Sequence, residues 1–185
     1  MFSLVLSFKM SVVGDKPLAA SWSESGSVHL WDITHPLQAV NDPTLLKNYI
    51  ENKESPRPLF TFKGWSWNDE VNIIAWLLII SIPCLGHSTE GFALDWSSTT
   101  PGVLATGDCK KHIHVWKPLE GGQWAVEQRP LVGHTSSVED LQWSPNEPNV
   151  LASCSVDRRL VSGLCLWSVN LSVSDHSCVL HFQIR

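Results

Sequence analysis

The sequence has little cysteine and no apolar run long enough to cross a membrane. Its five cysteines are an odd number and lack any C-x-x-C spacing, so they favour a reduced, intracellular compartment over a disulfide framework. They are Cys84, Cys109, Cys154, Cys165 and Cys178. The apolar run from Ile73 to Leu85 is shorter than the roughly 20 residues that span a bilayer, so we expect no membrane segment.

Positive charge is also scarce. The chain has 13 Lys and Arg against 18 Asp and Glu, a net charge of -5, and contains no basic block of the kind that marks a nucleic-acid binder. Direct binding to DNA or RNA is therefore not expected. In the opening segment the first basic residue, Lys9, follows the apolar residues, whereas in a secretory signal peptide it would precede them.

Tryptophan is abundant where tyrosine is nearly absent, with ten Trp and one Tyr. Two of the Trp residues belong to an internal repeat: GHSTEGFALDWS, beginning at Gly86, is matched by GHTSSVEDLQWS, beginning at Gly133, 47 positions later. The same displacement places Trp96 on Trp143 and carries the LAT sequence at 104–106 onto the LAS sequence at 151–153. The match therefore covers two successive strand-like segments with a turn between them.

Repeats of about 40–45 residues with Gly-His near the start and Trp-Asp near the end are typical of WD40 blades, each a four-stranded antiparallel sheet. A weaker third copy, LAASWSESGSVHLWDI, has two alternating segments around Gly26 and ends in Trp31-Asp32. After it, Asp42 and Pro43 predict the start of a short helix between blades. The fold class is therefore an all-β, partial WD40 β-propeller of about three imperfect four-stranded blades, with one inter-blade helix.

Resemblance to WD blades implies that a His, a Ser or Thr, a turn Asp and a Trp form a hydrogen-bonded chain within each blade, because buried polar groups need partners. The middle repeat supplies His87, Thr106 and Trp116, and the last repeat supplies His134, Ser153 and Asp157. Each set departs from the pattern. The middle repeat has Lys110 in the turn-Asp position, and the last repeat has Gly163 where the Trp is expected.

His, Ser and Asp could instead form a hydrolytic triad or a metal site. Their recurrence at equal displacement favours a structural role, because an active site needs one constellation and not several. His112 and His114 would share a strand face and could offer two metal ligands, but no third ligand stands nearby. We therefore expect no catalytic residues, no metal and no cofactor, and we expect that the protein is not an enzyme.

Two stretches do not fit the repeat: an apolar insertion at 65–85 and a tail at 171–185. The insertion is either a genuine addition packed as a buried strand or helix, or sequence from an alternative or misassembled transcript; we favour the second. The expected organisation is a first partial blade with the inter-blade helix at 1–64, the insertion, a WD blade at 86–132, an imperfect blade at 133–170, and the tail. Such an incomplete propeller exposes open edges, which predicts low stability.

The segments GHSTEGFALDWS and RPLVGHTSSVEDLQWSP resemble the glutamate-rich WD-repeat family of eukaryotes, and the resemblance covers residues 12–64 and 86–158. It implies a seven-bladed propeller of which this chain is an incomplete or alternatively spliced form. It also implies histone binding and assembly of the large ribosomal subunit in the nucleus and nucleolus. The partners expected from it are core histones, a large-subunit ribosomal protein, and other subunits of a pre-ribosomal or chromatin complex. The glutamate-rich segment that names the family does not occur in the sequence.

In WD propellers the contacts of the top face come from the residues that flank the start of each inner strand and from the residue before the turn Asp. Counting from each Gly-His gives Glu90, Phe92, Cys109, Ser137, Glu139 and Val156. Two of these six are acidic, which would suit a basic partner, and an ordinary solvated surface is an equally open interpretation of the same residues. The expected function is a non-catalytic, histone-chaperone-like and ribosome-assembly scaffold. The alternative is a structural or non-productive splice fragment that binds nothing by itself.

Overall fold

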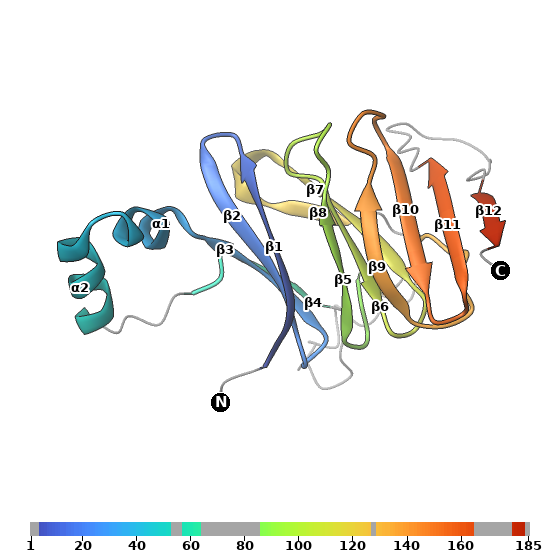
Figure 1. Ribbon diagram of the computed structural model, residues 1–185, viewed down its shortest axis with the longest axis horizontal. Coiled ribbons are helices and arrows are strands. Elements are labelled where there is room, and N and C mark those ends of the chain that lie inside the picture. The colour runs from blue at the N-terminus through green and yellow to red at the C-terminus, as the bar shows by residue number, and fades with distance from the viewer. Residues whose placement is uncertain (1–3, 53–56, 64–85, 127–128, 165–178, 184–185) are drawn as a thin grey trace, which may run out of the picture.

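Three four-stranded antiparallel sheets make up most of the described chain in the computed structural model (Figure 1). The structure describes residues 4–52, 57–63, 86–126, 129–164 and 179–183. Within each sheet, strands that follow one another in the chain are neighbours in space. This meander is the topology of a propeller blade, and it confirms the predicted fold class. The predicted insertion at 65–85 lies outside the described residues.

Blade 1 consists of β1 (Val5–Val13), β2 (Lys16–Ser23), β3 (Ser27–Asp32) and β4 (Phe60–Lys63). The two alternating segments around Gly26 are β2 and β3, and Gly26 takes a positive φ of 77° in the turn between them, as a glycine turn residue can. The sequence did not predict β1, because its apolar residues read only as a short N-terminal stretch. It pairs with β2 over its whole length, with one register shift between Val5 and Ser7.

Two helices stand between β3 and β4, α1 (Thr34–Val40) and α2 (Pro43–Asn52). The predicted helix is α2. A side-chain oxygen of Asp42 accepts hydrogen bonds from the backbone N–H of Thr44, at 2.8 Å, and of Leu45, so Asp42 caps the helix as its sequence position indicated. The shorter α1 was not predicted. No helix among the described residues has the length and apolar composition needed to cross a bilayer.

Blade 2 consists of β5 (Gly91–Trp96), β6 (Leu104–Asp108), β7 (Ile113–Pro118) and β8 (Trp124–Val126), with a short 3-10 turn, η1 (Glu120–Gly122), before its last strand. Blade 3 consists of β9 (Val138–Trp143), β10 (Val150–Ser155), β11 (Arg159–Leu164) and β12 (Val179–Gln183). The sequence placed the end of the repeat at residue 170 and a tail after it. In the structure, β12 lies within that tail and pairs with β11 as the fourth strand.

Apolar side chains fill the two spaces between the blades. One core lies between blades 1 and 2 and includes Trp22, Leu30, Leu94 and Trp116; the other lies between blades 2 and 3 and includes Ala105, Val138 and Leu141. Blade 2 is therefore covered on both faces. The first strands of the three blades, β1, β5 and β9, lie next to one another (Figure 1), and we call them the inner strands.

Candidate partner-binding face

The predicted contact residues lie at one end of the blades, the lower end in Figure 1. This end carries the turns between the second and third strands and the segments that enter the inner strands. We call it the recognition face. It stands on a buried polar network that begins at the Gly-His of each repeat.

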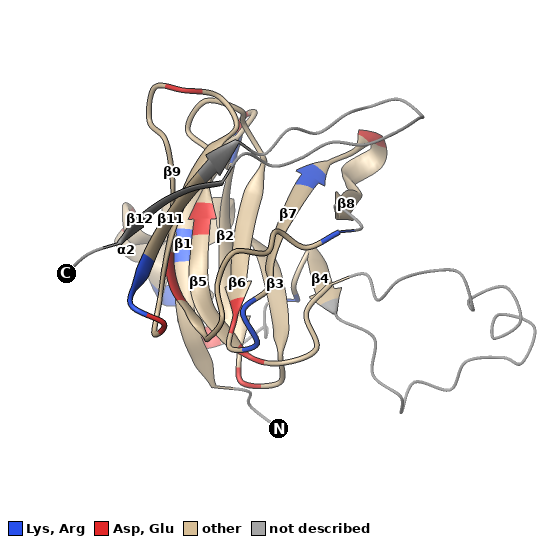
Figure 2. Cartoon of the chain, turned by 90° about the vertical axis from the view of Figure 1, so that its right-hand side faces the viewer, with Lys and Arg blue, Asp and Glu red and all other residues tan. Residues whose placement is uncertain are grey.

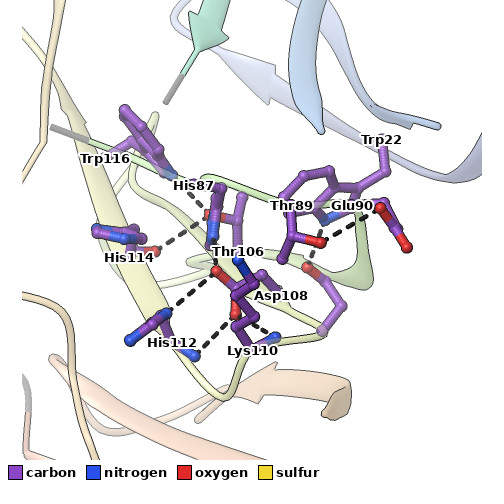
Figure 3. A network of polar contacts seen from close by, with 11 residues as sticks. Trp22, His87, Thr89, Glu90, Thr106, Asp108, Lys110, His112, His114 and Trp116 are labelled. Atoms are coloured by element: carbon purple, nitrogen blue, oxygen red, sulfur yellow. Dashed lines mark hydrogen bonds and ion pairs between the residues drawn. The ribbon is translucent and has the colours of Figure 1, made fainter. Parts of the chain in front are cut away.

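In blade 2 the network is a continuous chain of four side chains (Figure 3). The indole nitrogen of Trp116 donates to Thr106 Oγ1 at 2.7 Å, and Thr106 Oγ1 lies 2.6 Å from His87 Nε2. His87 Nδ1 lies 2.8 Å from Asp108 Oδ2. A neutral His87 with its proton on Nδ1 satisfies every member: it donates to Asp108 and accepts from the Thr106 hydroxyl. All four residues are buried.

The surroundings of His87 and Asp108 determine the protonation state of each side chain. Burial lowers the pKa of His87 below its ordinary value of 6.5, although the neighbouring Asp108 acts in the opposite direction. Burial acts to raise the pKa of Asp108, but hydrogen bonds from His87 and from the backbone N–H of His112 outweigh it, so this pKa lies below its ordinary value. The network thus holds a neutral imidazole against a carboxylate at neutral pH.

Asp108 supplies the acidic side chain that the sequence indicated was missing from blade 2. Lys110 occupies the aligned turn-Asp position, which indicated that the acid was missing from this blade. Asp108, two residues earlier at the end of β6, supplies the carboxylate, and its other oxygen accepts from the backbone N–H groups of Lys110 and His112, both at 2.9 Å. The signal available in the sequence was the presence of an Asp near the end of the second strand.

Among the described residues, blade 3 has the same network without an indole donor. His134 Nε2 lies 2.8 Å from Ser153 Oγ, and His134 Nδ1 lies 3.1 Å from Asp157 Oδ2. Asp157 also accepts from the backbone N–H groups of Thr135 and Arg159, bonds that outweigh burial and lower its pKa. Gly163 faces Leu151 in the register that pairs Trp116 with Leu104 in blade 2, so no indole reaches Ser153 from that position.

Equivalent backbone hydrogen bonds join the predicted contact residues in blades 2 and 3. The carbonyl of Glu90 accepts from the N–H of Cys109 at 3.0 Å, and in blade 3 the carbonyl of Ser137 accepts from the N–H of Val156 at 3.1 Å. The structure thus joins, in each blade, the segment that enters the inner strand to the turn after the second strand. Each pair of predicted positions is brought together in the same way.

The side chains at these positions differ in exposure. Glu90 and Glu139 are exposed, Phe92 is 41% exposed and Val156 is 59% exposed, whereas Cys109 and Ser137 are half-buried. The carbonyl of Phe92 accepts from Ser7 Oγ at 2.6 Å, which ties this strand to β1. The recognition face therefore presents two carboxylates and two apolar side chains.

Sequence reasoning missed four cations on the same face. Lys110 and Lys111 lie in the turn of blade 2, Arg158 and Arg159 at the turn of blade 3, and all four are exposed. Figure 2 shows blue Lys and Arg segments beside red Asp and Glu segments along this end of the sheets. The cations are not consecutive enough to form a basic block in the sequence, and only the turns place them at one end. The face carries both signs of charge.

The sequence suggested that His112 and His114 share a strand face and could offer two metal ligands. His112 precedes β7 and lies 3.5 Å from Asp108, while the ring of His114 is buried and packs edge-on against His87 at 4.6 Å. Within the described residues no group of three or more His, Cys, Asp or Glu side chains is arranged to hold a metal ion.

Known proteins match both the fold and the sequence. The WD domain, G-beta repeat family matches residues 126–161. Among solved structures, U3-55K covers 89% of the chain with a TM-score of 0.53 and 19% identity, and the WD40 repeats of RRP9 cover 89% with a TM-score of 0.54 and 19% identity. The chain covers 37% and 36% of those two proteins, respectively. Fold, network and repeat together define a WD-repeat β-propeller protein.

Sequence similarity to known proteins shows to which family of WD-repeat proteins the chain belongs. The chain is 41% identical over 157 residues to Protein HEAT STRESS TOLERANT DWD 1 of Arabidopsis thaliana. It is 36% identical over 141 residues to Glutamate-rich WD repeat-containing protein 1 of Dictyostelium discoideum, and 37% identical over 140 residues to Ribosome assembly protein rrb1 of Schizosaccharomyces pombe. These matches cover 85%, 76% and 76% of the chain. The chain belongs to the family of glutamate-rich WD-repeat proteins, and it spans 28%, 23% and 23% of these relatives' lengths.

Proposed function

We propose that this protein is a non-catalytic WD-repeat scaffold that binds a basic protein on the recognition face. The observation that carries the proposal is the exposed pair Glu90 and Phe92, which stands on the buried polar network. The carbonyl of Glu90 accepts from the N–H of Cys109, and the carbonyl of Phe92 accepts from the Ser7 hydroxyl. An exposed carboxylate and an exposed aromatic side chain two positions apart suit a partner rich in Lys and Arg, because a carboxylate pairs with a cation and an aromatic ring accepts a cation–π contact.

The kinship to Ribosome assembly protein rrb1 supports a pre-ribosomal setting. On that basis the proposed partner is a large-subunit ribosomal protein or a core histone, met in the nucleus or nucleolus together with other subunits of the assembling complex. Both partners are rich in Lys and Arg. Such a partner would contact the inner-strand positions Glu90 and Glu139, while Lys110, Lys111 and the two arginines of the neighbouring turn would repel it from the outer turns.

Pull-down of purified core histones and of a purified large-subunit ribosomal protein tests the proposal. We expect the double variant E90K/E139K to lose most binding and F92A to weaken it. Glu147 provides the matched control, because it is also exposed but lies in the β9–β10 turn at the opposite end of the blade. E147K changes the net charge in the same direction and should retain binding.

Two outcomes would overturn the proposal. Equal loss in E147K and in the E90K single variant would show that binding follows net charge and not this face. A folded wild-type chain that captures neither basic protein would support the alternative of a structural fragment without binding activity. Circular dichroism of each variant separates loss of contact from loss of fold.

A further inference from the structure

Two turns of the recognition face each present a pair of adjacent cations. Lys110 and Lys111 follow β6 in blade 2, and Arg158 and Arg159 follow β10 at the corresponding turn of blade 3. We call them the cationic turns. All four residues are exposed, and apolar cores cover both faces of blade 2. The cations of blade 2 thus stay at the surface although their blade has a neighbour on each side.

The backbone of each cationic turn is held from below. Asp108 accepts a hydrogen bond from the backbone N–H of Lys110 at 2.9 Å, and the turn Asp of blade 3 accepts one from Arg159 at the same distance. Lys111 and Arg158 take positive φ angles of 71° and 64°, in a region that residues with a side chain rarely adopt. Residues other than glycine in this region cluster at functional sites such as ligand clamps. The backbone that carries the cations is therefore in place before a partner binds.

Carboxylates lie next to the cationic turns. The carbonyl of Glu90 accepts from the N–H of Cys109, the residue just before Lys110, at 3.0 Å, so the exposed Glu90 and the turn of blade 2 lie close together. In blade 3 the equivalent bond ties the segment that leads into the exposed Glu139 to the cationic turn of that blade. Within the described residues no ion pair joins either glutamate to one of the four cations. Both signs of charge are therefore open to a partner.

A partner of a single charge sign does not match this surface. A uniformly basic segment suits the two glutamates but is repelled by the cationic turns. A nucleic-acid strand is uniformly anionic and meets the opposite problem at the glutamates. The net charge of -5 and the lack of a basic block also disfavour a nucleic acid. A protein segment can carry both signs within a few residues and so can match both places.

We propose that the recognition face binds a protein segment of mixed charge, with basic side chains at Glu90 and Glu139 and acidic side chains at the cationic turns. This inference rests on the proposed function and adds to it a requirement for acidic residues beside the basic ones. Charges matched at both places select such a segment over a uniformly basic one, because like charges brought together lower the affinity of the wrong partner. The cationic turns thus set the specificity of the face.

Reversing the cations tests the inference by the sign of its effect on the affinity for the basic protein, core histone or ribosomal, that the wild type captures. If the turns only repel that protein, K110E/K111E binds it more tightly; we expect at least about tenfold weaker binding, and the same for R158E/R159E. K16E/K47E is the matched control, because Lys16 begins β2 at the opposite end and Lys47 lies on α2, both exposed. Equal or tighter binding by K110E/K111E would overturn the inference and leave the proposed function standing. A wild type that captures neither protein would overturn both.

Two synthetic peptides test the partner chemistry directly by fluorescence anisotropy. One joins a block of Lys and Arg to a block of Asp and Glu, and the other has Gln in place of each acid. The wild type should bind the mixed peptide at least about tenfold more tightly, and K110E/K111E should prefer the Gln peptide. A wild type that does not prefer the mixed peptide, or that binds a single-stranded RNA more tightly, would overturn the inference. Circular dichroism spectra that match the wild type ensure that each variant is folded.

Discussion

The indole nitrogen of Trp143 donates a hydrogen bond to the main-chain oxygen of Asp95, 3.1 Å away on the inner strand of the neighbouring blade. The backbone N–H of Trp143 also donates to Asp95 Oδ2 at 2.7 Å. One repeat earlier, the indole of Trp96 donates to the main-chain oxygen of Lys9 on β1 at 3.1 Å. The repeated Trp is thus the residue that ties each inner strand to the preceding one.

We predict that W143F lowers the free energy of unfolding by about 1–3 kcal/mol. The change keeps an aromatic ring but leaves the oxygen of Asp95 without its indole donor in a poorly hydrated contact. Urea denaturation followed by circular dichroism measures the loss. Y49F, in α2 and away from all three sheets, is the control and should change stability by less than about 0.5 kcal/mol; equal effects would contradict the inter-blade role.

A second prediction compares the two polar networks. T106V should cost about 2–4 kcal/mol, because it leaves both the Trp116 indole and His87 Nε2 without a partner in the core. S153A should cost about 1–2 kcal/mol, because His134 is the one side chain among the described residues of blade 3 that hydrogen-bonds to Ser153 Oγ. Denaturation midpoints of the two variants, measured side by side, decide the order. If S153A is the more damaging, the missing indole of blade 3 is not what distinguishes the networks.

The third prediction concerns Gly91, which separates Glu90 from Phe92. A Cβ added here would overlap the carbonyl oxygen of Gly107 and lie 2.8 Å from Cζ2 of Trp22. G91A should therefore destabilise the chain by about 3 kcal/mol or more, since neither neighbour can move without disturbing the sheet. G121A has open space around its added Cβ but a positive φ of 77°, and it should cost only about 1 kcal/mol. Thermal melts of both variants test the contrast.

The fourth prediction is a loss of stability on acidification. Because the pKa of His87 is lower in the folded chain than its ordinary 6.5, the unfolded chain takes up the proton first as the pH falls. Stability is therefore complete above about pH 6.5 and declines below it, by at most about 1.4 kcal/mol per pH unit for this group. The lowered pKa values of Asp108 and Asp157 add a further loss below about pH 3.8.

Denaturant titrations between pH 8 and pH 5 measure that slope for the wild type and for H87Q. The variant is expected to be less stable throughout, but its slope near pH 6 should be shallower by up to one proton. The slope is the informative quantity, because a purely structural defect would shift the curve without changing its steepness. Parallel curves would show that His87 does not carry the pH dependence.

Much of this fold follows from the sequence because the repeat is local and regular. The displacement that carries Gly86 onto Gly133 predicted the first two strands of blades 2 and 3, and Asp42 marked the start of α2. The strand β1 was missed because its alternation becomes visible only once β2 is known to pair with it. Strand β12 was missed because it follows a stretch without the repeat.

The candidate site was less predictable, for a geometric reason. Alignment assigns the turn acid to position 110, but both that position and Asp108 lie at the same strand end, and only the distance to His87 shows which one supplies the carboxylate. The four cations of the recognition face come from two turns that are remote in the sequence. Their association depends on how the blades stand side by side, which a single sequence does not encode locally.

The turns between the second and third strands offer an internal comparison. Gly26, Lys111 and Arg158 occupy the same place in successive blades: each closes its turn with an N–H bond to the residue three positions earlier, and each has a positive φ, of 77°, 71° and 64°. Glycine adopts this conformation without strain, whereas Lys and Arg do so at some cost in free energy. At positions 111 and 158 a basic side chain therefore adds positive charge to the surface, whereas a glycine would make the turn at a lower cost in free energy. Exchanging one for the other would leave the strands on either side unchanged.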